Sequence, residues 1–335
     1  MKMNKILAAL CVAGLATPQF ANATNGMLME GYGPIATGMG GASMAYDNGN
    51  AGMANNPATL GLMADGSRLD IALGGLHPSI TSKMTGMPDA ESGGTAYYMP
   101  AIGWTNKKGG MAYGIGMFAQ GGMGTEYKST DWVGAGSGLE SRSEVAVGNV
   151  IVPFAYEVSP ELTVGGSLDA VWSSMDLKMG MTATQMGGLM AQGNLSASGP
   201  ASTSPAFGTF MAGGNTSVGY FNFSDKSAFT GSAKSTGYAG KLGATYKVNK
   251  QLTMGASYHS KTSLGDMTAN GAVMDMIMSG TNVGSFSGKI SVVNFQFPET
   301  YGIGAAFQAT DDLLLVADWK RIGWKAVMKG FHMTF

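Results

Sequence analysis

The amino-acid sequence predicts an all-β protein, a transmembrane antiparallel β-barrel whose lumen holds a small helical hatch. Three observations favour this fold class. Only 12% of the 335 residues are charged, yet after the N-terminal segment no stretch approaches the ~18 consecutive apolar residues of a membrane helix. Apolar and polar side chains alternate along many segments, as they do where one face of a strand meets lipid. Short polar turns also alternate with long connections, which is typical of outer-membrane barrels.

Residues 1–23 have the layout of a secretory signal peptide. Lys2 and Lys5 precede an apolar centre over residues 6–16, and small residues at 21–23 form a cleavage site, so we expect the mature chain to begin near Thr24. Cys11, the single cysteine, lies within this segment. The mature chain is therefore expected to have neither disulfides nor thiolate chemistry.

Residues 24–66 predict a hatch inside the barrel. Glycine occupies seven positions between residues 31 and 52, and most of the rest are small, so the segment cannot build a core of its own. We expect one helix over about Ile35–Ala45. A second should begin at Pro57, whose fixed φ suits a first helical position, with Asn56 as its N-cap.

Residues 67–335 are assigned to the barrel, which we expect to be incomplete. The strongest signal is a repeat in which an aromatic residue stands six positions before a leucine, with a polar turn between them. The three aromatics are Tyr156, Tyr246 and Phe307. After each leucine, apolar residues recur at every second position, which places them on a lipid-facing side below an interfacial aromatic. A soluble β-sandwich also alternates, but the signal peptide and the unequal loops favour the barrel.

Nine strands follow from this pattern, separated by short turns on one side and long connections on the other. Residues 326–335 could add a tenth strand, since Phe331, Met333 and Phe335 alternate, but only residues 322–325 would then remain for the turn. We favour a chain that is incomplete at its C-terminus, because closing the barrel removes unpaired sheet edges from lipid. The expected strands are 67–83, 95–105, 110–120, 143–157, 161–178, 235–248, 251–264, 289–308 and 311–324, and the long connections are 84–94, 121–142, 179–234 and 265–288.

The segment GMGGASMAYDNGNAGMANNPATL, residues 38–60, resembles the hatch of the FadL/TodX family of outer-membrane channels for hydrophobic compounds. The matching residues are Gly38, Gly40, Gly41, Asp47, Asn56, Pro57 and Ala58. The resemblance implies a 14-stranded barrel in a longer chain, of which about nine to ten strands are present here. It also implies a location in the Gram-negative outer membrane.

In function, the resemblance implies passive uptake of long-chain fatty acids or of aromatic or aliphatic hydrocarbons, by loop capture, hatch rearrangement and lateral release. The expected partners are these hydrophobic molecules, the outer-membrane lipid and, during biogenesis, the barrel-assembly machinery, with the protein a monomer. The alternative is a non-transporting structural or adhesive barrel.

Two methionine-rich stretches, residues 179–191 and 267–278, fall in the long connections after the fifth and seventh expected strands. Methionine is flexible and polarizable, so it suits a site that accepts apolar molecules of several shapes. In the family these two connections form an external capture groove. The alternative is that methionine is simply frequent, with 27 in the chain. The candidate capture residues are Met181, Met186, Leu189, Met190, Met274, Met276, Ile277 and Met278.

Glycines and prolines coincide around the third expected strand. Gly114 and Gly116 interrupt it, and Pro100 and Pro153 in the neighbouring strands cannot donate ladder hydrogen bonds. The resemblance implies that a kink here opens a lateral window into the membrane. A bulge that only shapes the barrel is the alternative.

No catalytic, metal or cofactor motif is apparent, so we expect neither an enzyme nor a bound cofactor. His77, His259 and His332 lack metal-ligand spacing. Without Lys2 and Lys5 the formal net charge changes from −1 to −3, which gives no reason to expect nucleic acid. A fatty-acid cargo would need a cationic anchor for its carboxylate. The candidates are the three arginines, Arg68, Arg142 and Arg321.

Overall fold

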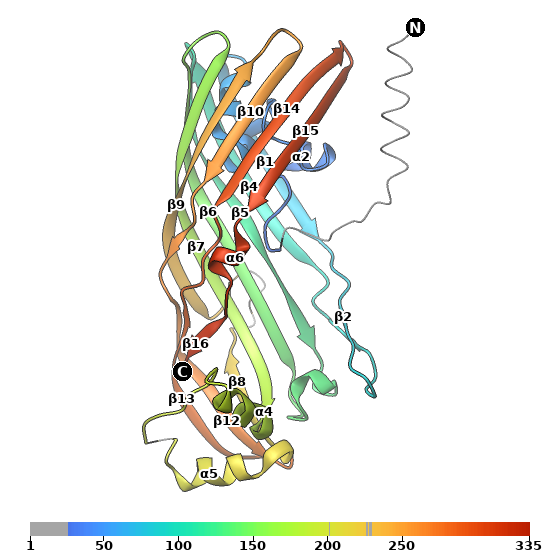
Figure 1. Ribbon diagram of the computed structural model, residues 1–335, viewed down its shortest axis with the longest axis vertical. Coiled ribbons are helices and arrows are strands. Elements are labelled where there is room, and N and C mark those ends of the chain that lie inside the picture. Colours follow the sequence, from blue (N-terminus) through green and yellow to red (C-terminus); the bar gives the residue numbers. More distant parts are fainter. Residues whose placement is uncertain (1–25, 201, 226, 228–229) are drawn as a thin grey trace.

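The computed structural model describes residues 26–335 except 201, 226 and 228–229, so the expected signal peptide lies outside the described residues. Long tilted strands form one curved antiparallel sheet around the short helices of the hatch (Figure 1). Short turns lie at one end of the strands and helices α4 and α5 at the other. No helix among the described residues is long and apolar enough to cross a membrane.

Nine long strands correspond to the nine expected from the sequence, and each pairs with the next of the nine, even across the long connections. In sheet order they are β1 (Gly66–Leu76), β4 (Tyr97–Lys108), β5 (Met111–Tyr127), β6 (Ser141–Glu157), β7 (Leu162–Thr182), β9 (Ala233–Lys247), β10 (Leu252–His259), β14 (Thr300–Thr310) and β15 (Leu313–Ile322). Within the described residues, β1 pairs only with β4, and β15 only with β14.

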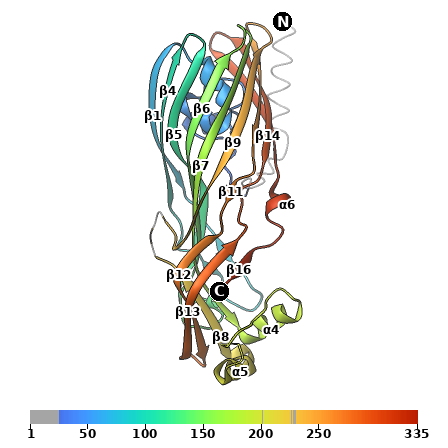
Figure 2. The same ribbon diagram turned by 90° about the vertical axis from the view of Figure 1, so that its left-hand side faces the viewer.

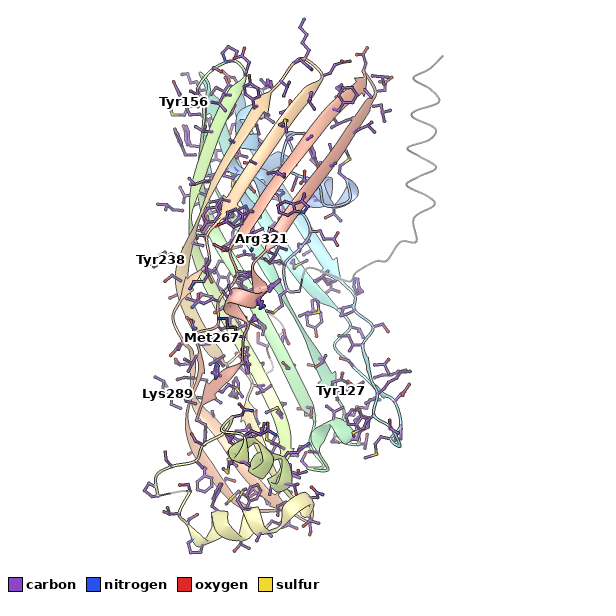
Figure 3. All side chains as sticks on the ribbon, viewed as in Figure 1. Tyr127, Tyr156, Tyr238, Met267, Lys289 and Arg321 are labelled. Carbon is purple, nitrogen blue, oxygen red and sulfur yellow. The ribbon has the colours of Figure 1, made fainter. Side chains whose placement is uncertain are left out.

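The alternation expected for a lipid-facing surface is confirmed. Leu168, Met254 and Trp319, on β7, β10 and β15, are between 52% and 78% exposed. On each strand, the residues immediately before and after them face the interior of the barrel. Tyr246 and Tyr238 on β9 are both exposed and lie eight residues apart. At ~3.3 Å per residue they are separated by about 26 Å along the strand, which at a tilt of about 35–45° is a height of roughly 19–22 Å, within the ~25 Å apolar band of such barrels. Tyr156 and Tyr238 project outward in Figure 3.

The long connections contain more regular structure than the sequence predicts. In the connections expected over 179–234 and 265–288, β7 extends to Thr182, β9 begins at Ala233, and further strands pair between them. The connections contain α4 (Ala183–Ala191), α5 (Pro205–Ala212), η4 (Gly214–Thr216), β8 (Ser217–Phe223), β11 (Ser263–Leu264), β12 (Met267–Met278) and the first part of β13 (Thr281–Val293). β8 pairs with the last six residues of β7 and with β12, which forms a hairpin with β13.

Three other expected boundaries also differ. The strand expected over 289–308 is two strands, β13 and β14, because Asn294 adopts φ 56° and Pro298 follows. The strand expected over 67–83 ends at Leu76, before Pro78, and the connection after it contains β2 (Thr81–Ser82) and β3 (Ala90–Glu91). β5 extends seven residues past its expected end to Tyr127, so that η3 (Trp132–Gly134) holds the centre of a shorter connection.

The C-terminal segment does form a short strand, β16 (His332–Thr334), after helix α6 (Trp324–Val327). It pairs with β13, so it does not continue the sheet beyond β15 as the tenth strand considered above would do. Its neighbour Phe335 packs edge-to-face on Phe221 of β8, with ring centroids 6.2 Å apart.

The hatch consists of α2 (Pro34–Gly38), η1 (Gly49–Ala51), α3 (Gly52–Asn55) and η2 (Pro57–Leu62). In Figure 2 these helices lie behind β6 and β7. The first expected helix is shorter than Ile35–Ala45, because Gly40 and Gly41 adopt φ values of 68° and 88° that end it. The second begins at Pro57 as expected, with the side chain of Asn56 accepting from the Ala58 N–H.

Candidate functional site

The hatch is fastened to the wall by buried polar contacts on both sides. Arg68 of β1 donates two hydrogen bonds of 2.7 Å to the carboxylate of Asp47. On the opposite side, Asp318 of β15 accepts from the Ser43 N–H at 2.7 Å, and Lys320 Nζ donates to the carbonyls of Glu30 and Gly41. The contacts of Asp318 and Lys320 satisfy backbone groups that the glycine-rich segment cannot pair within itself, and together with the Arg68–Asp47 pair they fix the position of the segment in the lumen.

Asn56 connects the hatch to the part of the barrel wall formed by β9. Its Nδ2 donates to the carbonyls of Met44, at 2.7 Å, and of Ala244 in β9, at 3.2 Å, and its side chain is fully buried. The wall opposite is glycine: a Cβ at Gly243 would lie 2.0 Å from Asn56 Oδ1, and one at Gly255 would lie 1.9 Å from the Met44 carbonyl. Only glycine therefore allows the hatch to approach β9 and β10 this closely.

A cavity of about 80 Å³ lies between the hatch and the inner wall. Its apolar side includes Met29, Met44 and Phe118. Tyr32 also lines it and packs edge-to-face on Phe118, with ring centroids 5.2 Å apart. Burial raises the pKa of Tyr32 to about 12, so its phenol stays neutral at any pH a cell meets. The polar side includes Glu30, Gln120, Asn149, Asp169, Lys241, His259 and Lys320.

The two lysines that line the cavity are matched by partners. Lys241 and Asp169 form an ion pair in which both side chains are less than 5% exposed. Lys320 Nζ donates to hatch carbonyls and lies 3.9 Å from Asp318. His259 Nε2 donates to the Asn55 carbonyl at 2.6 Å, since a carbonyl oxygen can only accept. The cavity thus has polar groups at one side but no unpaired cation.

The wall is interrupted beside this cavity. The β4–β5 ladder ends at the pair Ala101–Phe118, so that Pro100 and the three residues before it have no partner in β5. Farther along, the Gly93 N–H donates to the Glu126 carbonyl at 2.8 Å and closes the gap again. Between these points β5 bulges at Gln120, where its register against β6 shifts. A Cβ at Gly121 would lie 2.1 Å from the Met27 carbonyl, so the N-terminal arm of the hatch, residues 26–32, rests against the bulge.

Gly114 and Pro153 lie where the pairing of β5 with β6 is locally interrupted, and Gly116 resumes it. β5 pairs with β6 on both sides of Gly114 and Ile115 but not at these two residues, which lie opposite Val152 and Pro153. On its other side, β5 stays paired with β4 here, and a Cβ at Gly116 would lie 2.9 Å from the sulfur of Met53 in the hatch. These glycines therefore make room for Met53, and the longer gap, between β4 and β5, lies farther along, from Pro100 to the bulge at Gln120.

The methionine-rich stretches meet at the long-loop end. Met186 of α4 packs with Met274 and Met276 of β12 and with Phe210 of α5 in one buried cluster. α4 begins with a capping box in which Thr182 and Gln185 exchange hydrogen bonds. Met181 borders this cluster, and Ile277 belongs to an adjacent cluster with Val218 and Tyr220. Leu189, Met190 and Met278 are only half-buried.

None of the three candidate arginine anchors lines the cavity. Arg68 is paired with Asp47 of the hatch. Arg142 pairs with Glu126 and Glu144 on a different part of the wall. Arg321 is exposed at the end of β15, in the outward-facing register of Trp319 (Figure 3). The three arginines therefore do not face this cavity, whose cations are Lys241 and Lys320.

Sequence reasoning missed the polar residues of the cavity wall. A signal for them exists, because Asp169, Lys241 and His259 each occupy the position opposite to the lipid-facing register of an amphipathic strand. That register predicts an inward side chain but not which inward residues share a cavity.

The fold and the cavity define an outer-membrane β-barrel with an internal hatch. The model of the family described as outer membrane protein transport protein (OMPP1/FadL/TodX) matches residues 14–329, so this chain belongs to that family. The chain is 32% identical to the Pseudomonas putida toluene transporter TodX, with a TM-score of 0.82, over 91% of this chain and 73% of that chain. It is 34% identical to the Ralstonia pickettii toluene transporter TbuX, with a TM-score of 0.78, over 91% of this chain and 75% of that one.

A curated relative from Chlorobium limicola is an uncharacterized protein from the 5′ region of the phosphoenolpyruvate carboxykinase gene. It is 50% identical over 82 residues, which are 24% of this chain and 39% of that protein. The chain thus spans about two fifths of that relative's length. The family's location is the Gram-negative outer membrane, which agrees with the exposed apolar band between aromatic residues described above.

Proposed function

We propose that this protein mediates passive uptake of small hydrophobic compounds across the outer membrane. The single observation that carries the proposal is the position of the cavity, which lies between the hatch arm and the gap in the wall at Gln120. The toluene-transporting relatives support monoaromatic hydrocarbons as cargo. Because the cations at the cavity are already paired, neutral cargo fits better than fatty-acid anions.

In the proposed route, cargo is first captured at the methionine-rich cluster formed by α4, α5 and β12. Buried methionines there can adjust their side chains to apolar molecules of different shapes. Cargo then moves to the cavity against the hatch. At both places the apolar surface of the cargo is removed from water, which is favourable, so the route needs no energy source.

The hatch arm must rearrange for cargo to occupy the cavity. A cavity of about 80 Å³ is smaller than the ~150 Å³ that accommodates benzene in an engineered protein core. Met29 and Met44 can supply part of the space by changing rotamers. Movement of residues 26–32 away from Gly121 would supply the remainder, and it would also open the path to the gap between β4 and β5. Release into the membrane follows, because the cargo prefers hydrocarbon to water.

The test removes the bulge. Deleting Gln120 lets β5 continue in register against β6, and we expect uptake of radiolabelled toluene by whole cells to fall to near the level of cells without the protein. Whole cells are needed because lipopolysaccharide slows direct entry of hydrocarbons. Gln120→Ala is the control, since it retains the extra residue and should preserve most of the uptake.

Two outcomes would count against the proposal. Normal uptake by the deletion variant, with the barrel folded, would show that release does not depend on the bulge that borders the gap between β4 and β5. Uptake by the unaltered protein no faster than by cells lacking it would favour the alternative of a structural or adhesive barrel with a closed hatch.

A further inference from the structure

A stripe of polar side chains crosses the inner wall beside the cavity. It runs through five adjacent strands, from Gln120 on β5 and Asn149 on β6 to Asp169 on β7, Lys241 on β9 and His259 on β10. Each residue lies opposite or diagonal to the next in the strand registers. Because the strands tilt, diagonal neighbours lie at a similar height in the lumen. We call this stripe the polar belt; a purely apolar cargo would not require such polar side chains on the wall.

Most of the belt is satisfied by protein partners. Asn149 Nδ2 donates to Gln120 Oε1 at 3.2 Å, Asp169 pairs with Lys241, and His259 donates to the Asn55 carbonyl. Asn149 Oδ1 is the exception. Several buried side-chain atoms of the described residues lack a hydrogen-bond partner, and Asn149 Oδ1 is the one among them whose residue lines this cavity. Asn149 is only 2% exposed, and an orphaned buried polar atom costs about 1–3 kcal/mol.

The surroundings of Asn149 Oδ1 indicate which kind of group could donate a hydrogen bond to it. Asn149 lies opposite Val171, so Asp169 is its diagonal neighbour on β7, at a spacing of about 7–8 Å between Cα atoms. No hydrogen bond joins Asn149 to the Asp169–Lys241 pair within the described contacts. One oxygen atom with hydrogen-bond distances of ~2.8 Å to both sides would bridge such a space. Lys241 retains donors for it, because an ammonium has three hydrogens.

We propose that this belt is a subsite for a neutral hydroxyl group carried by an otherwise apolar cargo, such as a phenol or an aromatic alcohol. This inference rests on the proposed channel function and names the class of cargo. The hydroxyl donates to Asn149 Oδ1 and accepts from Lys241, while the ring lies against Phe118, Met29 and Met44. A hydroxyl is suitable because it both donates and accepts, and so satisfies an amide atom of either kind.

A carboxylate does not fit the same place. Its negative charge would lie beside Asp169, whose charge already neutralises Lys241, and Lys320 donates to the hatch. Burying an anion without a free cation is strongly unfavourable. A plain hydrocarbon fits the apolar side but leaves Asn149 Oδ1 unpaired. The belt therefore favours the hydroxylated compound over its carboxylated and unsubstituted analogues.

The experiment compares p-cresol with toluene, which differ by one hydroxyl. Binding to the purified protein in nanodiscs is measured by equilibrium dialysis against empty nanodiscs. We expect tighter protein-specific binding of p-cresol than of toluene. Asn149→Leu should weaken p-cresol binding roughly ten- to hundredfold while leaving toluene binding within about threefold. Asn149→Ala, which cannot overpack the site, should weaken p-cresol binding in the same direction.

The control is Asn106→Leu, the same exchange on the same barrel at a side chain outside the cavity, whose contact is the Tyr113 hydroxyl at 3.3 Å. It should change neither affinity. Equal binding of the two compounds to the unaltered protein, or p-cresol binding unaffected by both Asn149 variants, would overturn the hydroxyl subsite and indicate a trapped water instead. Neither result bears on channel activity, which toluene uptake by cells decides separately.

Discussion

Replacing Asn56 with alanine should loosen the hatch without unfolding the barrel. Asn56 is fully buried, and its side chain makes three hydrogen bonds, to the carbonyls of Met44 and Ala244 and from the Ala58 N–H. The alanine variant leaves the Met44 carbonyl and the Ala58 N–H without this partner. At about 1–3 kcal/mol for each orphaned buried group, the hatch should lose at least about 2 kcal/mol of local stability.

Hydrogen–deuterium exchange of the purified protein measures this loss directly. A loss of about 2 kcal/mol corresponds to roughly 30-fold lower protection, which we expect in the amides of residues 42–62 and not in those of β6 and β7. Asn106→Ala removes one exposed contact and is the matched control. Unchanged protection of the hatch in Asn56→Ala would refute the reasoning, because it would mean that backbone packing alone holds the segment.

Two further predictions concern packing. Gly255→Val places a Cβ about 1.9 Å from the Met44 carbonyl, so the hatch must shift. A cysteine introduced as a probe by Ser43→Cys, at a position buried in the unaltered protein, should then react much faster with maleimide. The control is Gly208→Ala, which has open space around its Cβ and should leave the rate unchanged; equal rates in both variants would contradict the close approach. Met186→Ala should weaken the docking of α4 on β12 by about 2–5 kcal/mol, seen as faster amide exchange over residues 183–191. Exposed Met87 provides the control, Met87→Ala, and exchange equally slow in both variants would mean that α4 is held by its capping box.

The barrel strands could be predicted because their determinants are local. An apolar residue at every second position and a polar turn of two to four residues are both visible within one hairpin. Contact with lipid requires the apolar alternation, and the backbone geometry of a tight turn between two strands requires the turn residues. Asn56 and Pro57 are similar, since an N-cap and its proline act within two residues of each other. All these features appear in the structure at or near their expected positions.

The methionine-rich hairpin was less predictable. Residues 267–278 satisfy no simple alternation, since Met274, Met276 and Ile277 are all buried, and β12 forms because β8 and β13 pair with its two edges. The strand is thus stabilised by β13, whose paired residues lie 3 to 25 positions away, and by β8, whose paired residues lie 51 to 61 positions away. A sequence pattern shows the composition of such a segment but not whether an edge is available to pair with it.

The sequence by itself determined the class of the protein, its lipid-facing register and the hatch, because each depends on residues within a few positions of one another. Tertiary structure alone decided where the cavity lies that we propose as the cargo site. The cavity joins Asn55 to His259, 204 residues apart, and aligns Asn149 with Asp169 and Lys241 through strand registers that shift at the Gln120 bulge. A one-residue change of register turns an inward side chain toward lipid, so these residues become a site only once the sheet has formed.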